Sequence, residues 1–374
     1  MDRTFTQPFA TLRAAVDDLP GGLHLDAHLR AAYRSADPFP LDRPTDVRVY
    51  SLGIEKAFTT LPLTVTAGRF YNRYDRFSGY WDGLNLHVGD REQGVGVAAG
   101  FQPSRTDASP SGDLPKYTVF GHRAFAVEGA RVDAVLLAGQ VRPRNDSMQT
   151  RTFIGAQQTA HARGFALSTE ALLDQDPETG EWTFSRLNAR INTTISDGLR
   201  LRAYARSSRS YLFFGEQQTL LDRTTRFGGG ATLLLRSGPL PNTALRADLS
   251  TATAEGRPST LTASGGLSIP RIPSTGVGLS ANATVWTRDE VTGTQRGLYG
   301  SAGLTRSFGS LYARLGYRYQ QSPLTVGEAL VTHGLEALVQ VPITRRLAFT
   351  MQASTNLSDR ISSTRIYSAL WYRL

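Results

Sequence analysis

Three side chains near the start of the chain have types and a spacing that suit metal binding. His24, Asp26 and His28 occupy alternate positions, so in an extended strand they project from one face. Strand residues two apart are separated by about 7 Å, which is too far for one ion to hold all three without ligands from elsewhere. The segment therefore predicts a polar face of a strand, and we expect no metal site.

The sequence lacks the residue patterns of an enzyme. It has six histidines and no cysteine, and no nucleophile motif accompanies the histidines. The absence of cysteine excludes a disulfide scaffold, thiolate zinc sites and iron–sulfur ligation. No glycine-rich phosphate loop follows a strand and opens a helix, which disfavours nucleotide binding. We therefore expect no catalytic residues and no cofactor, with a membrane-embedded hydrolase as a minor alternative.

Arginine carries most of the positive charge. The formal net charge is +9, and of the 41 basic residues only Lys56 and Lys116 are lysines, which leaves 39 arginines. The arginines are scattered along the chain rather than gathered in blocks, which is not the pattern of a nucleic-acid-binding tail. We therefore expect no nucleic-acid partner.

Strands must position these arginines, because apolar and polar residues alternate with period two from residue 23 to the end. In residues 310–320, for example, Leu311, Ala313 and Leu315 lie opposite Tyr312 and Arg314. The alternating segments predict strands at 23–34, 47–58, 62–72, 81–90, 94–102, 116–127, 131–141, 151–161, 164–174, 182–195, 198–211, 225–236, 243–253, 259–270, 275–287, 296–307, 310–320, 331–342, 346–357 and 362–374.

The connections between these segments alternate between long and short along most of the chain. Residues 35–46, 73–80, 103–115, 142–150 and 212–224 form long connections, and short ones separate them. A meander of hairpins with tight turns at one edge and longer loops at the other gives this pattern. Two of the long segments, 103–115 and 212–224, are candidates for a loop that narrows a pore.

Segment length distinguishes a membrane barrel from a soluble sheet protein. No stretch approaches the 18–20 apolar residues that a spanning helix needs, whereas a tilted spanning strand needs about 9–11 residues. Soluble strands usually have about five or six, and no repeat of fixed period supports a propeller or solenoid. Closing a long meander removes its edges. The sequence therefore predicts an all-β fold, a single transmembrane antiparallel up-and-down β-barrel of about 18–20 strands.

The end of the chain carries a local signal for this fold. In TRIYSALWYRL, which ends the chain, Ile366, Leu370, Tyr372 and Leu374 lie on one face. This pattern resembles the last strand of Gram-negative outer-membrane β-barrel proteins, although Leu374 replaces their usual terminal aromatic residue. The resemblance implies a location in the outer membrane, short periplasmic turns, longer extracellular loops, and contact with membrane lipid and the barrel-assembly machinery. It leaves open whether copies of the chain associate.

A second stretch favours porins within that class. In residues 67–103, Gly68-Arg69 and Asp82-Gly83 flank a loop and precede a strand, which is similar to an arrangement found in porins. Residues 23–374 are then the barrel. The first twenty residues lack the layout of a signal peptide. Residues 1–22 are expected to be a leader or a short periplasmic or plug segment, with a short helix over 9–19.

If the apolar face meets lipid, the polar face lines a pore. Clear inward acids on that face are few, namely Asp26, Glu170, Asp248 and Glu336. The arginines assigned to it are Arg30, Arg186, Arg190, Arg200, Arg202, Arg206, Arg246, Arg314, Arg318 and Arg365. Permanently charged guanidinium groups raise the local concentration of anions. The alternative is that loop carboxylates such as Asp75, Asp107 and Asp113 neutralise them.

The sequence thus predicts an outer-membrane porin, a passive diffusion channel for small hydrophilic solutes with a preference for anions. One alternative is a barrel that serves as the translocation or anchoring module of a larger outer-membrane protein. The other is the barrel hydrolase.

Overall fold

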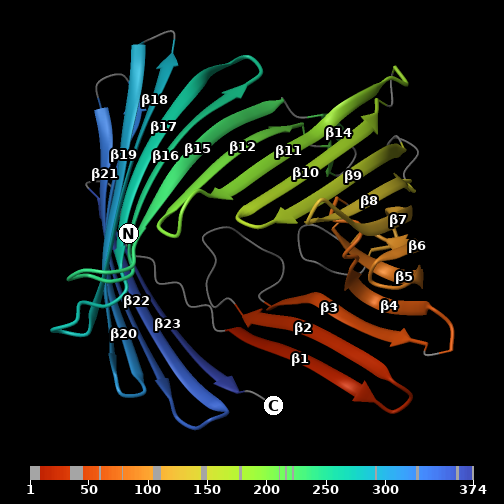
Figure 1. Cartoon of the computed structure of the whole chain (residues 1–374), viewed down its shortest axis with the longest axis horizontal. Helices are drawn as coiled ribbons and strands as arrows, with labels where there is room; N and C mark the ends of the chain where they lie inside the picture. The colour runs from red at the N-terminus through yellow and green to blue at the C-terminus, as the bar shows by residue number, and fades with distance from the viewer. Residues whose placement is uncertain are drawn as a thin grey trace. The chain divides into compact units, whose positions relative to one another are not determined.

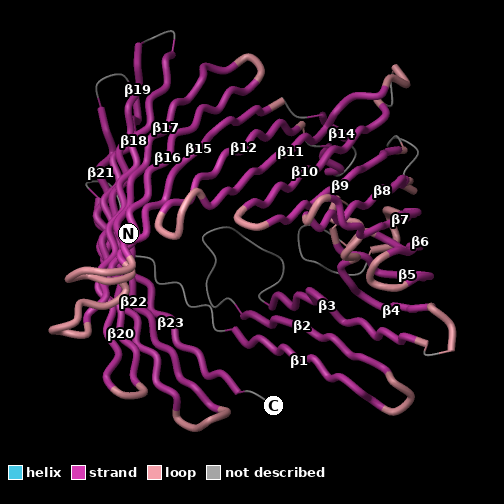
Figure 2. The backbone as a smooth tube through the Cα atoms, in the orientation of Figure 1, coloured by secondary structure: helices cyan, strands magenta, loops and turns pink. Residues whose placement is uncertain are grey.

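The structure is a computed structural model, which describes residues 9–33, 45–58, 60–77, 79–103, 111–144, 150–176, 179–209, 211–214, 217–220, 223–290, 293–325, 328–358 and 362–372. Strands joined by turns and loops make up this part of the chain (Figure 2). No helix long and apolar enough to cross a membrane occurs among these residues.

The strands follow one another along the chain. Their bounds are β1 Phe9–Leu19, β2 Leu23–Tyr33, β3 Thr45–Ala57, β4 Leu63–Tyr71, β5 Tyr80–Gly89, β6 Gln93–Phe101, β7 Pro115–Val127, β8 Ala130–Val141, β9 Arg151–Ala162, β10 Phe165–Gln175, β11 Trp182–Thr194, β12 Leu199–Ser208, β13 Tyr211–Phe214, β14 Gln217–Leu220, β15 Thr224–Leu235, β16 Thr243–Ala254, β17 Arg257–Ile269, β18 Val277–Glu290, β19 Gly293–Phe308, β20 Leu311–Thr325, β21 Glu328–Pro342, β22 Leu347–Ser358 and β23 Ser362–Tyr372.

In the described part of the chain, 21 strands form one sheet, and consecutive strands pair antiparallel (Figure 1). Each of the 20 predicted segments is a strand that begins and ends within a few residues of the expected bounds. The all-β, up-and-down prediction is therefore confirmed. Strands β13 and β14 form a separate hairpin, which lies almost wholly within the connection expected at 212–224.

The first strand corrects the prediction for the start of the chain. Residues 9–19 form β1, which pairs with β2 so that Leu12 lies opposite Leu29 and Ala14 opposite Ala27. The predicted helix is wrong because these residues also carry an apolar period of two, and pairing satisfies the backbone edge that β2 would otherwise expose. Among the described residues, the sheet thus begins at Phe9 rather than at residue 23, and it has 21 strands.

The chain divides into two compact units. The first contains residues 1–163, 168–187 and 209–221, and the second contains residues 164–167, 188–208 and 222–374. In the first unit, the connections after β4, β6 and β8 are long, as predicted. In the second unit, only two or three residues separate β16 from β17, β18 from β19, β20 from β21, and β22 from β23.

In each unit, apolar side chains lie on one face of the sheet, where they are exposed, and polar side chains lie on the other face. On β5 of the first unit, Leu84 and Val88 are 42% and 49% exposed, whereas His87 on the opposite face is 3% exposed. On β16 of the second unit, Leu249 is 57% exposed and Ser250 is 8% exposed. This is the reverse of a soluble protein, and it suits a sheet whose apolar face meets lipid.

A small apolar core lies on the polar face of the first unit. Phe120, Leu137, Val141, Phe153 and Leu172 form it, and they come from β7 to β10. Three partly buried residues from loops, Tyr74, Phe77 and Leu114, pack against it. The core therefore exists because loop residues fold back over the sheet.

Candidate functional site

The segment after β4, residues 72–77, lies on the polar face of β5, β7 and β9. Asp75 is fully buried there and accepts hydrogen bonds from Thr118 Oγ1 at 3.1 Å and from the Phe77 backbone N–H at 3.2 Å. Asn72, also buried, accepts a bond from the Tyr74 backbone N–H at 3.0 Å. These contacts fix the segment against the sheet. The candidates that the sequence offered for an inward loop, 103–115 and 212–224, did not include this segment.

Aromatic stacking adds to this attachment. The Tyr74 ring stacks on Phe120, His122 and His87, with centroid distances of 5.0, 4.3 and 5.1 Å. Burial raises the pKa of Tyr74, and the Arg73 guanidinium, which lies 4.8 Å from the Tyr74 ring centroid, opposes that shift. The aromatic and Asx-turn residues of 72–77 were the sequence signal for a packed loop, and the prediction did not use it.

A polar cavity of about 310 Å³ opens beside this segment within the first unit. Arg73 and Tyr74 of the segment line it together with Glu55, Asn85 and His87 from β3 and β5. Glu55 accepts a hydrogen bond from Thr66 Oγ1 at 3.1 Å. Charges of both signs and amide groups thus face one space, which suits a small hydrophilic solute.

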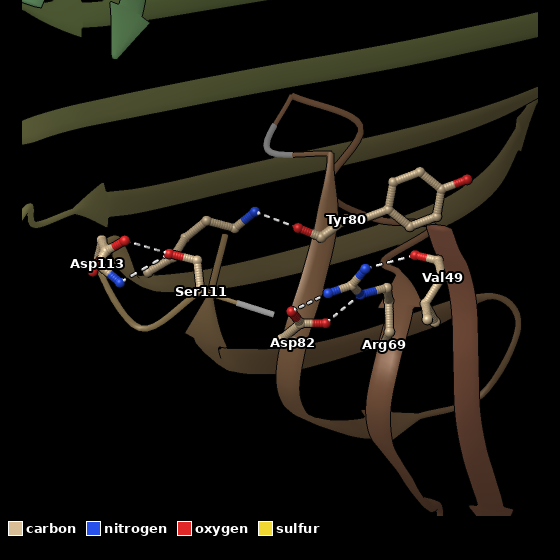
Figure 3. A network of polar contacts seen from close by, with 7 residues as sticks. Val49, Arg69, Tyr80, Asp82, Ser111 and Asp113 are labelled. Carbon is tan, nitrogen blue, oxygen red and sulfur yellow. Dashed lines mark hydrogen bonds and ion pairs between the residues drawn. The ribbon is translucent and has the colours of Figure 1, made fainter. Parts of the chain in front are cut away.

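The residues that resemble the porin arrangement contact one another. The Arg69 guanidinium donates two bonds of 2.5 Å to the Asp82 carboxylate and one of 2.6 Å to the Val49 carbonyl (Figure 3). Gly68 lies opposite Gly83 in the β4–β5 pairing. Gly68 has a φ of +106°, and a Cβ there would collide with the Leu52 carbonyl. Glycine at this position therefore allows β3 and β4 to approach closely.

A second cluster, here called the arginine cluster, lies on the polar face of β12, β15 and β16 in the second unit. It consists of Arg200, Arg202, Arg206, Arg226 and Arg246. Cross-strand pairing puts Arg206 opposite Arg226, and puts Thr232 opposite both Arg200 and Arg246. Of the predicted inward residues, Arg200, Arg202, Arg206 and Arg246 are thus brought together.

One carboxylate lies within the arginine cluster. Asp248 accepts bonds of 2.8 and 2.5 Å from Arg202 Nε and Nη2, which reach it across β15. Gly230 leaves the space for this contact, because a Cβ at that position would collide with the Asp248 carboxylate. The three glycines 228–230 hide the alternation on β15, so the sequence pattern did not predict that Arg226 lies on the polar face.

The other predicted arginines have contacts of their own. Arg30 contacts the Phe9 ring at 4.3 Å, and Arg186 lies 5.7 Å from the Phe77 ring. Arg190 donates to Asn192 Oδ1 at 3.4 Å. The remaining three, Arg314, Arg318 and Arg365, have Leu338, Gly334 and Ser354 as their cross-strand partners.

Two of the loop carboxylates named as possible partners of the arginines lie among the described residues. Asp75 binds Thr118 and the Phe77 backbone, and Asp113 accepts a bond from Ser111 Oγ at 2.8 Å (Figure 3). Asp107 lies outside the described residues.

His24 and His28, near the start of the sheet, have different side-chain partners. His24 Nδ1 lies 2.5 Å from Asp17, whereas His28 accepts a bond from Arg13 Nε at 3.2 Å and stacks on Tyr50. Across the described ranges, no three metal-ligating side chains of the His, Cys, Asp or Glu type gather in one place.

The last strand presents apolar side chains outward. Ile366 and Leu370 are 71% and 64% exposed, and they lie opposite Ala353 and Phe349 of β22. Tyr372 pairs with Leu347, and Leu374 lies outside the described residues.

Comparison with solved structures identifies the fold. The P pilus usher (PapC) translocation pore matches with a TM-score of 0.54 and 9% identity, covering 99% of this chain and 96% of that one. This chain is a β-barrel. The resemblance to outer-membrane barrels seen in the sequence is therefore confirmed at the level of fold.

Two other solved structures align over nearly the whole barrel. OccK10 (OpdN) of Pseudomonas aeruginosa matches with a TM-score of 0.47 and 13% identity, covering 100% of this chain and 98% of that one. A BenF-like porin from Pseudomonas fluorescens Pf-5 matches with a TM-score of 0.45 and 12% identity, covering 99% and 97%. No protein-family model and no curated protein matches the sequence.

Proposed function

We propose that this barrel is a passive channel of the Gram-negative outer membrane for small hydrophilic solutes, with a preference for anions. The observation that carries the proposal is the arginine cluster on the polar face of β12, β15 and β16. Five guanidinium groups share that surface with one carboxylate, Asp248, which is bound to Arg202. No feature of the described site calls for catalysis.

The arginine cluster acts on solutes because it lies on the polar face of the sheet. An apolar outer face in lipid leaves the polar face as the wall of the lumen. Guanidinium groups stay charged at all physiological pH values, and a charged wall beside low-dielectric protein raises the local concentration of the opposite ion. Four of the five arginines are not neutralised by Asp248, so the wall attracts anions.

The 72–77 segment supports a channel with a narrowed lumen. It is held on the polar face by Asp75 and by the Tyr74 stack, so it reduces the cross-section there. The adjoining cavity of about 310 Å³ carries Arg73 and Glu55. A solute that passes this point meets both charges.

The direct test is the reversal potential of the refolded protein in a planar bilayer under a salt gradient. We expect an anion-selective value for the unaltered chain. Substituting Arg200→Gln, Arg202→Gln and Arg206→Gln together should move it toward cation preference, because three of the five clustered charges are removed.

The matched control removes three arginines from short turns. Arg271, Arg345 and Arg346 are exposed and lie between β17 and β18 or between β21 and β22. Their replacement by Gln changes net charge by the same amount and should shift the reversal potential less. Equal shifts in the two triple variants would mean that net charge, rather than the arginine cluster, sets selectivity.

A translocation pore is the second candidate function. The solved structure that matches with a TM-score of 0.54 is described as a translocation pore, and the match covers 99% of this chain and 96% of that one. In that case the barrel would belong to a larger outer-membrane protein. A barrel that resists SDS unless heated but gives no steady openings in the bilayer would favour this alternative over the open channel.

We also propose that the barrel-assembly machinery reads the outward face of β23. Ile366 and Leu370 form an exposed apolar stripe at the last strand. Changing Leu370→Asp should reduce the fraction of heat-modifiable barrel in cell membranes, whereas Ala369→Asp on the polar face of β23 should reduce it less. Equal assembly of both variants would contradict this role.

A further inference from the structure

We propose that His87 and His122 form a binding site for one divalent transition-metal ion, of the Cu(II) or Ni(II) class. The site lies on the polar face of the first unit. His87 belongs to β5 and His122 to β7, so the two imidazoles meet across the intervening strand β6. Their Nε2 atoms are 2.9 Å apart.

The distance between the two nitrogens indicates the geometry. With metal–nitrogen bonds of about 2.0–2.1 Å, two nitrogens 2.9 Å apart subtend an angle of about 90° at the ion. Right angles between neighbouring ligands are typical of square-planar and tetragonal Cu(II) and Ni(II). A tetrahedral zinc ion would need the nitrogens about 3.3 Å apart. In the metal-free protein, one imidazole donates its Nε2 proton to the other.

Glycines on β6, the strand between the two histidines, leave room for the imidazoles to meet. His87 pairs with Gly96, and His122 pairs with Gly94. A Cβ on Gly94 would collide with His87 Nε2 and lie 2.8 Å from His122 Nε2. Any side chain on Gly94 would therefore occupy the place where the two nitrogens converge.

The rings are oriented before any ion arrives. Tyr74 stacks on both imidazoles, and the His87 and His122 centroids are 5.1 Å apart. His87 is 3% exposed, and its Nδ1 is buried with no hydrogen-bond partner. The stack and the Nε2 contact thus determine the ring position, and a preorganised ligand pair loses little entropy on binding.

Charged groups of both signs act on the pair. Arg73 from the 72–77 segment acts on both histidines, and Asp90 from the turn after β5 opposes it at both. Glu55 from β3 also opposes it at His87. His87 also lines the polar cavity, which gives the ion a route in and leaves water to fill its remaining coordination positions. A site with two protein ligands should be exchangeable rather than permanently loaded.

The experiment is titration of the refolded, detergent-solubilised protein with Cu(II), followed by electron paramagnetic resonance. We expect one tight Cu(II) per chain, with hyperfine structure from two imidazole nitrogens. His87→Gln and His122→Gln should each weaken binding by at least about tenfold, because loss of a direct ligand costs more than loss of an outer-shell partner. His161→Gln, on an exposed histidine of β9, is the matched control and should bind as the unaltered chain does.

Gly94→Ala tests the site without removing a ligand, and should lower the affinity while both histidines remain. Heat-modifiable migration on SDS gels checks that each variant is folded. If a variant does not fold, the number of imidazole nitrogens bound to Cu(II) in the unaltered protein still tests the proposal. A spectrum with one nitrogen or none, or equal affinity in the two histidine variants and the control, overturns the proposal and indicates an adventitious ion only. None of these readouts requires conductance, so failure here is distinct from failure of the channel proposal.

Discussion

At the scale of single residues, burial determines which ion pairs contribute most to folding stability. The Arg69 and Asp82 side chains are 4% and 20% exposed, and Arg69 also bonds the Val49 carbonyl. The Arg131 and Asp133 side chains are 59% and 42% exposed, and their atoms are 3.4 Å apart. Removing one partner of a buried pair leaves the other charge uncompensated, whereas an exposed charge returns to solvent.

We therefore expect Asp82→Ala to lower the free energy of unfolding by about 3 kcal/mol or more. The control substitution Asp133→Ala should cost less than about 1 kcal/mol. Denaturant unfolding of the refolded protein in micelles measures both. Similar losses in the two variants would show that the Arg69–Asp82 pair adds nothing beyond a surface contact.

The carboxyl group of Asp90 makes a contribution to folding stability that depends on pH. Backbone N–H groups of Gln93 and Glu92 bond its Oδ1 at 2.9 and 2.7 Å, and these bonds hold the pKa of the carboxyl below its usual 3.8. A lowered folded-state pKa gives a stabilising contribution that is present above the unfolded pKa and lost as the pH falls through the folded one.

Acidification to about pH 3 should therefore destabilise the unaltered chain more than the Asp90→Asn variant, which cannot ionise at this turn. Unfolding midpoints of the two proteins at neutral and acidic pH give the comparison. An identical loss of stability in both would exclude a contribution from Asp90.

At the scale of elements, glycine positions shape the sheet. Gly53, Gly68, Gly83 and Gly100 lie opposite one another across β3, β4, β5 and β6. The missing side chains let these strands approach closely. Elsewhere, Gly94 and Gly230 let side chains from the two flanking strands meet across a third. Contacts that skip one strand thus build both His87–His122 and Arg202–Asp248.

Adding one methyl group tests this role. A Cβ on Gly83 would collide with the Ala99 carbonyl and lie 2.6 Å from Gly100 Cα, whereas the nearest atoms to a Cβ on Gly121 are 3.8 Å away. Gly83→Ala should cost about 1–3 kcal/mol, as overpacking does, and Gly121→Ala should be nearly neutral. Unfolding midpoints compare the two. Equal unfolding midpoints for the two variants would mean that the strands at Gly83 move apart without a loss of stability.

The 72–77 segment is the second element with a predicted effect. Replacing Asp75 with Ala removes the acceptor for Thr118 and for the Phe77 backbone, so the segment should detach from the polar face. If the barrel is an open channel, Asp75→Ala should raise single-channel conductance and its noise. Unchanged conductance with a folded barrel would show that 72–77 does not narrow the lumen.

At the scale of the whole molecule, the two faces require two environments. On β18, Val285 is 46% exposed on the apolar face, and Thr284 lies next to it on the polar face. A charge on the lipid face of a barrel is costly, whereas a charge on the lumen face is solvated.

Val285→Arg should therefore destabilise the barrel by about 2–4 kcal/mol if the position lies near the middle of the bilayer, and Thr284→Arg should change stability little. Unfolding in phospholipid vesicles is the measurement, because micelles adapt to a charge more easily than a bilayer does. If Thr284→Arg proved the more damaging, the assignment of the two faces would be reversed.

The sequence alone was enough to predict 20 of the strands and the two faces of the sheet. A period of two is a local property, so it survives whatever the distant contacts are, and all 20 predicted segments are strands. It also places Arg200, Arg202 and Arg206 on one face, because residues two apart in a strand share a side. Pattern alone misread residues 9–19, where pairing with β2 favours a strand over a helix.

Tertiary structure decided which side chains meet. Arg226 joins the arginine cluster, and His87 meets His122, only because particular strand registers bring them together across glycines. The inward position of residues 72–77 likewise depends on Thr118, Phe120 and Gly155, which are distant in sequence. Such contacts are set by register and loop packing over long separations, and period-two patterning carries no information about either.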